Sequence, residues 1–184
     1  MMRRMAIFSS VLVLAVCVGV SQAGMREGLG SLEEKDYPRA AENFRPLAEQ
    51  GRTVAMYNWG LLLDRGLGVE RDRSSAAVWY RLAAKKGLAR AQYNLALLLM
   101  LGQGVEQDYE KAANWLHKAA EQDMARAQYN LSILYFEGLG VHISYDRSRR
   151  LNSKAKQGGF VKGECDLNYA GICTSRAGFI LEED

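Results

Sequence analysis

The chain has 184 residues, of which 48% are hydrophobic and 24% charged, with 18 glycines and only 2 prolines. These proportions are those of a folded domain, and they exclude a collagen, a low-complexity tail and a polytopic membrane protein. Arg3 and Arg4 precede every acidic residue, so the chain after residue 23 carries 22 basic and 21 acidic side chains. This balance gives no reason to expect binding to nucleic acid.

The first 23 residues have the pattern of an export signal. Arg3 and Arg4 are followed by an uncharged apolar run from Met5 to Val20, and Ser21, Gln22 and Ala23 then provide a small-x-Ala cleavage site. This pattern predicts cleavage after Ala23 and a secreted protein, with the periplasm as its expected location. The alternative is a retained membrane anchor, because the uncharged stretch continues to Met25 and approaches the roughly 20 residues that span a bilayer.

The rest of the chain repeats itself with a period of 36 residues, which is typical of a repeat architecture. Three copies, residues 53–88, 89–124 and 125–160, agree in eight columns. In the middle copy these columns are Ala91, Tyr93, Asn94, Leu98, Gly102, Gly104, Val105 and Ala119. Residues 24–52 match the second half of a copy and are expected to form an N-terminal capping half-repeat. Residues 161–184 are expected to form a degenerate C-terminal cap.

Each copy is predicted to be a pair of antiparallel helices. In the middle copy the apolar spacing is helical from about Leu88 to Leu101 and again from about Tyr109 to Glu121. Gly102 and Gly104 lie between them, where glycine allows the positive φ that ends a helix, and Asp108 suits the N-cap of the second helix. Neither helix can bury its apolar face alone, so stacked pairs should form an all-α, right-handed solenoid of roughly nine helices.

These motifs resemble the Sel1-like repeat, a relative of the tetratricopeptide repeat. The resemblance rests on A-x-Y-N-L, G-x-G-V-x-x-D and A-A-x-W-(x)3-A-A, and it covers residues 53 to 160, in a member of the exported bacterial type. The third copy departs from the pattern, with Ser144 for the loop Asp, Ser148 and Arg149 for the Ala pair, and Leu151 for Trp. The resemblance implies a protein that binds other proteins.

Cys165 and Cys173 are the only cysteines after the export signal. An even count in an exported chain favours a disulfide, because no reducing pool protects thiols there. A metal site is the weaker interpretation, since His117 and His142 lie well upstream and no spacing matches a zinc site. Both histidines are therefore expected to be exposed, and neither a metal nor a cofactor is predicted.

No catalytic motif is convincing in this sequence. The three Gly-x-Gly pairs follow no strand and are better explained as turns between helices. Ser153 and Lys156 match the S-x-x-K of penicillin-recognising serine enzymes, and some exported relatives are thought to interact with penicillins. The accompanying S-D-N and K-T-G are absent. The chain is therefore predicted not to be an enzyme.

The candidate binding surface is the outward face of the first helices. If the pairs curve as in tetratricopeptide arrays, these helices line a concave groove, and the expected partner-binding residues are Arg90, Tyr93, Asn94, Arg126, Tyr129 and Asn130. Asn can pair with a peptide backbone and Arg with a carboxylate, while Tyr offers a large rigid surface. In the alternative interpretation the Asn and Tyr side chains only pack neighbouring helices together.

The function expected from these features is that of an exported, non-catalytic adaptor or regulator in the cell envelope, which grips a segment of a partner protein. One alternative is an enzyme acting on peptidoglycan or β-lactams, or a modulator of such an enzyme. Another is a structural spacer tethered by an uncleaved segment before Ala23. The resemblance of fold alone does not choose between these.

Overall fold

The computed structural model describes residues 23–160, and within them it contains eight helices and no strand. Residues 23–33 form the first helix. The seven that follow are α2 (Tyr37–Glu49), α3 (Thr53–Arg65), α4 (Arg73–Lys85), α5 (Ala89–Leu101), α6 (Tyr109–Glu121), α7 (Ala125–Glu137) and α8 (Tyr145–Gln157). The all-α prediction is confirmed.

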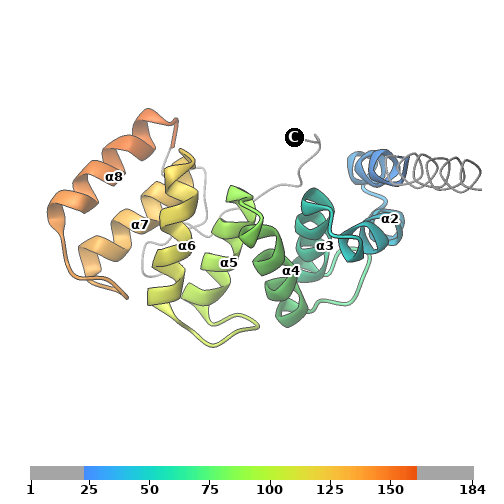
Figure 1. Ribbon diagram of the computed structural model, residues 1–184, viewed down its shortest axis with the longest axis horizontal. Coiled ribbons are helices and arrows are strands. Elements are labelled where there is room, and N and C mark those ends of the chain that lie inside the picture. Colours follow the sequence, from blue (N-terminus) through green and yellow to red (C-terminus); the bar gives the residue numbers. More distant parts are fainter. Residues whose placement is uncertain (1–22, 161–184) are drawn as a thin grey trace, which may run out of the picture.

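The helices form one row in which each packs against the next. The pairs α3 with α4, α5 with α6 and α7 with α8 are joined to one another through the contacts of α4 with α5 and α6 with α7. Figure 1 shows this succession from α2 to α8 as an elongated array. A single apolar core runs through nearly all of it and is rich in alanine and leucine, so the helix axes can approach closely. This arrangement is the solenoid that the sequence predicts.

The helix ends lie where the sequence places them. Helix α5 ends at Leu101, and Gly102 follows with φ of 63° while its N–H donates to the Leu98 carbonyl. Helix α6 begins at Tyr109, and the Asp108 carboxylate accepts a hydrogen bond from the Lys111 N–H at 2.8 Å. A glycine end cap and an aspartate start cap therefore define the turn inside the repeat.

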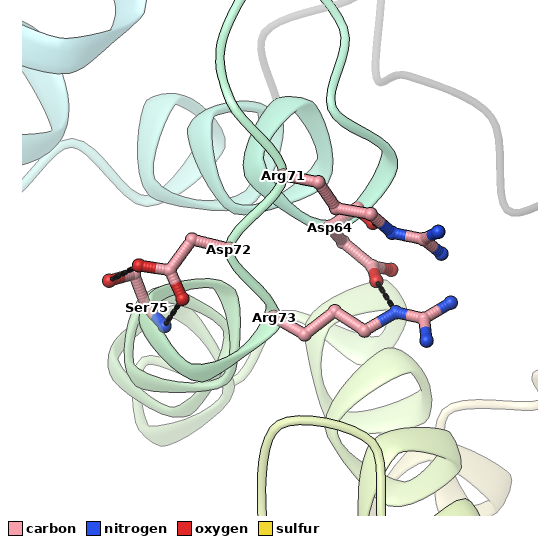
Figure 2. A network of polar contacts seen from close by, with 5 residues as sticks. All are labelled: Asp64, Arg71, Asp72, Arg73 and Ser75. Carbon is pink, nitrogen blue, oxygen red and sulfur yellow. Dashed lines mark hydrogen bonds and ion pairs between the residues drawn. The ribbon is translucent and has the colours of Figure 1, made fainter.

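Polar contacts hold the turn between α3 and α4 (Figure 2). Arg73 Nε lies 3.2 Å from Asp64 Oδ1, and Arg71 Nε donates to the Asp64 carbonyl oxygen at 2.9 Å. Asp72 caps α4 by accepting from the Ser75 N–H at 3.0 Å. The end of one helix and the start of the next are thus tied together across the turn.

The second glycine of each turn presses on the preceding repeat. Gly104 has φ of +71°, and a Cβ placed there would lie only 2.5 Å from the carbonyl carbon of Arg73. Gly68 is equally close to Tyr37, and Gly140 to Tyr109. In each case the neighbour is the first residue of the second helix one repeat earlier. These columns are therefore glycine both for backbone conformation and for lack of space.

The N-terminal unit contains two helices, because the helix over residues 23–33 packs against α2. Met25 and Leu32 are buried in the same core as Phe44, and a Cβ on Gly28 would lie 3.0 Å from the Phe44 ring. None of the helices described in residues 23–160 is long and apolar enough to cross a membrane.

The third pair is complete despite its altered sequence. Helix α8 forms with Ser144 as its N-cap, and the Arg147 N–H donates to Ser144 Oγ at 3.5 Å. The described part ends at Phe160, so the predicted bridge between Cys165 and Cys173 lies outside it. Residues 1–22 of the predicted export signal also lie outside the described part.

Candidate functional site

The six side chains expected to line a groove separate into buried and accessible ones. Tyr93 and Asn130 are fully buried, and Asn94 and Tyr129 are only 5% and 6% exposed. By contrast, Arg90 is exposed and Arg126 is half-buried. The Asn and Tyr residues therefore do not form the water-facing surface that an open groove would present.

The buried amides join neighbouring repeats through the tyrosines. Asn130 Nδ2 donates to the Tyr93 hydroxyl at 3.5 Å, and one repeat earlier the Asn94 side chain hydrogen-bonds with Tyr57. Each contact joins equivalent columns of consecutive first helices. Buried polar groups that hydrogen-bond to each other hold the helices in one register, so this geometry favours the packing interpretation of the Asn and Tyr ladder.

The electrostatics of this interior support the same conclusion. Burial raises the pKa of Tyr57 to about 12, although Arg90, Arg65 and the hydrogen bond from Asn94 act against the shift. Burial likewise raises the pKa of Tyr80 well above its ordinary value. Both phenols stay protonated at neutral pH, so neither contributes charge to this interior.

A second set of buried amides was not identified from the sequence. Gln92 Nε2 donates to the Ala84 carbonyl at 3.2 Å, and Gln128 Nε2 donates to the Ala120 carbonyl at the same distance. Those carbonyls belong to the last turn of the preceding helix, where backbone acceptors lack helical partners. The only sequence signal was the repetition of Gln at positions 92 and 128, with Met56 in the first copy.

The accessible residues of the first helices include Arg90 and Arg126, together with Arg65, Phe136 and Glu137. Arg90 and Arg126 occupy the same column of consecutive repeats, at the start of α5 and α7. Ile133 on α7 is half-buried, and Glu137 at its end is exposed. The Tyr129 ring is covered by Phe160, which stacks on it with centroids 4.3 Å apart and an interplanar angle of 24°.

The residues considered for catalysis or metal binding are scattered. Ser153 and Lys156 are exposed one turn apart on α8. His142 is exposed as expected, but His117 is half-buried, with Nε2 2.9 Å from the Tyr135 hydroxyl. Within residues 23–160 no three His, Cys, Asp or Glu side chains come together as metal ligands would.

Comparison with known families gives a match to the Sel1 repeat over four segments, residues 21–51, 53–88, 89–124 and 125–160. The first segment covers the N-terminal helix pair that the sequence pattern alone left as a half-repeat. A comparison with curated proteins gives no match.

Two solved structures share the fold. The crystal structure of a Sel1 repeat protein from Oxalobacter formigenes is 33% identical over 72% of this chain, with a TM-score of 0.68. The structure of c5321, a protective antigen of uropathogenic Escherichia coli strains that displays an SLR fold, is 36% identical over 82% of this chain, with a TM-score of 0.74. The chain spans 54% of the first protein and 33% of the second. The repeat columns, the helix pairs and these matches together show that the chain belongs to the Sel1 repeat family.

Proposed function

We propose that this protein is an exported, non-catalytic adaptor or regulator of the cell envelope that binds a segment of a partner protein along its first helices. Proteins built from Sel1 repeats generally mediate interactions between proteins. The observation that carries the proposal is that Arg90, which is exposed, and Arg126, which is half-buried, occupy the same column one repeat apart. Arginine binds carboxylates and backbone carbonyls through several N–H donors, so two of them can hold an extended segment in register.

The envelope location rests on the N-terminal pattern and on one structural neighbour. Arg3, Arg4 and the apolar run before Ala23 have the order of a secretory signal. The neighbour c5321 is a protective antigen. Both features support a location in the cell envelope.

The proposal is tested by capture of the partner in intact cells. A photo-crosslinking residue at the exposed position 137, on the same helix as Arg126, should join the protein to a defined partner that mass spectrometry identifies. The Arg90→Ala, Arg126→Ala double variant should lose most of this crosslink. The matched control is the Arg81→Ala, Arg149→Ala variant, which removes two exposed arginines from second helices.

The two variants should unfold at nearly the same temperature as the unaltered protein, because surface substitutions usually change stability by less than about 0.5 kcal/mol. Full capture by the Arg90→Ala, Arg126→Ala variant would show that the first helices are not the binding face. Equal losses in both double variants would point to general charge attraction and would also contradict the proposal.

A further inference from the structure

A cavity of about 300 Å³ opens between the last three helices of the described array. Its lining consists of His117 from α6, Tyr135 from α7, and Arg147, Arg150, Leu151 and Lys154 from α8. The four α8 residues follow the i, i+3, i+4, i+7 spacing that places side chains on one helix face. Three cationic side chains and no carboxylate therefore line one recess.

The floor of the cavity is ordered by a phenol that both neighbouring helices contact. Tyr135 is only 4% exposed, and its hydroxyl accepts a hydrogen bond from Arg147 Nη1 at 3.0 Å. The same hydroxyl lies 2.9 Å from His117 Nε2, and the Arg147 guanidinium sits 5.3 Å from the centre of the Tyr135 ring. Arg147 is thus held in place before any ligand arrives, which reduces the entropy lost on binding.

The equivalent groove one repeat earlier has a different charge balance. It includes Arg81 and Lys111, but Glu106 and Asp108 line it as well. Lys111 Nζ lies 2.7 Å from Asp108 Oδ2, so its charge is compensated within the repeat. In the last repeat the two acidic positions are His142 and Ser144. Arg147 keeps the positive charge of Lys111 there, His117 replaces Arg81, and both carboxylates are lost.

Two further replacements change the charge and the size of the cavity. Position 150 is Arg where the preceding repeat has Asn114, which adds a third cation. Position 151 is Leu where the preceding repeats have Trp79 and Trp115. In the second repeat the Lys118 ammonium sits 4.4 Å from the centre of the Trp115 ring, whereas Leu151 and Lys154 at the same positions line open space. A smaller side chain therefore leaves room for a ligand.

We propose that this cavity binds an acidic peptide segment, with one apolar side chain against Leu151 and Tyr135 and flanking carboxylates on Arg147, Arg150 and Lys154. The proposal rests on the proposed function and specifies the chemistry of the partner. The recess has the size of one or two side chains at the lower end of ligand-pocket volumes, which suits a peptide better than a flat lipid surface. Arginines one turn apart can also hold carboxylates with two hydrogen bonds each.

The test uses the purified protein and three fluorescein-labelled peptides, Glu-Glu-Phe-Glu-Glu and its Gln and Lys counterparts, followed by fluorescence anisotropy. The acidic peptide should bind at least about ten-fold more tightly than the neutral one, which corresponds to about 1.4 kcal/mol. Arg150→Glu with Lys154→Glu should weaken that binding by about ten-fold or more. Leu151→Trp should weaken it similarly, because the larger ring fills the cavity with the residue that earlier repeats carry.

The matched control is Arg149→Glu with Lys156→Glu, which makes the same charge change on α8 outside the cavity. Its affinity should stay within about three-fold of the unaltered protein at 0.15 M salt, where distant surface charges are screened. All variants should keep the helical circular dichroism and the melting temperature of the unaltered protein. Equal binding of the acidic and neutral peptides, or equal losses in the control, would overturn the proposal. Binding to phosphatidylglycerol vesicles without binding to the peptide would also overturn it.

Failure of the cavity proposal can be distinguished from failure of the proposed function. If the Leu151→Trp and Arg150→Glu, Lys154→Glu variants still capture the cellular partner fully, the cavity assignment fails while the interaction role stands. The acidic peptide could bind as expected while the Arg90→Ala, Arg126→Ala variant captures the partner fully. In that case binding along the first helices is refuted and peptide binding in the cavity stands.

Discussion

Replacing Gly104 with Ala tests whether the second glycine of the turn is fixed by backbone conformation alone or also by lack of space. Gly104 has φ of +71°, and alanine in this left-handed region is destabilising by about 1 to 2 kcal/mol. The added Cβ would also lie 2.5 Å from the Arg73 carbonyl carbon and 2.6 Å from Arg73 Cβ. Backbone cannot move aside cheaply, so overpacking adds about 1 to 3 kcal/mol.

Gly102→Ala provides the matched control in the same turn. Gly102 has φ of +63°, but a Cβ there would meet only Gln107 at 3.4 Å, which is close to ordinary contact. This variant should therefore lose only the conformational part, about 1 to 2 kcal/mol. The difference between the two variants isolates the pressure of the turn on the preceding repeat.

Thermal unfolding followed by circular dichroism at 222 nm measures this difference. For a chain of this length about 1 kcal/mol shifts the melting temperature by about 2 to 4 °C, so Gly104→Ala should melt about 2 to 12 °C below Gly102→Ala. Equal melting temperatures would show that the contact with Arg73 relaxes without cost and would refute the reasoning. A lower melting temperature for Gly102→Ala would refute it as well.

Three further predictions concern the buried tyrosines and amides and the C-terminal cysteines. Replacing Asn94 and Asn130 with Ala should lower the free energy of unfolding by about 1 to 3 kcal/mol per site, because buried tyrosine hydroxyls lose partners; an unchanged melting temperature would return the amides to a binding role. Between pH 10 and about 12 the unfolded chain loses the Tyr57 proton while the folded chain keeps it, so the free energy of unfolding should fall by about 3 kcal/mol over this range. Urea titrations at each pH measure this fall, and the Tyr57→Phe variant should not show it. Cys165 and Cys173 should resist alkylation in protein taken from its oxidising compartment, and two reactive thiols would refute the bridge.

The helix bounds could be predicted because local rules and repetition act together. The glycine and aspartate caps around Gly102 and Asp108 depend on only a few neighbouring residues, and three copies of each signal remove most of the ambiguity of a single one. The N-terminal helix was not identified because this part of the chain lacks the signals of the later copies. Ser21, Gln22 and Leu32 stand where those copies have the Tyr, the Asn and the second Gly of the turn.

The candidate site was predicted less well than the fold, for a physical reason. Helical spacing shows which residues share a face, but it does not show what covers that face. In this array every first helix contacts both the preceding and the following helix, so Tyr93 and Asn130 are buried between repeats rather than exposed in a groove. Leu151 departs from the Trp of the earlier copies, and the sequence shows this. The cavity beside it is formed by three helices, so the pattern of a single helix does not predict it.

The contact of each turn glycine with the repeat before it has a consequence for how such chains can change length. Gly68, Gly104 and Gly140 each meet the residue that lies 31 positions earlier, and those residues are themselves 36 positions apart. Deletion of residues 89–124 would therefore place Gly140 against Arg73, in the position that Gly104 now occupies. Gain or loss of one whole unit therefore preserves this glycine contact at the new junction. The chain can change length in steps of 36 residues without losing it, and the two structural relatives are longer than this chain.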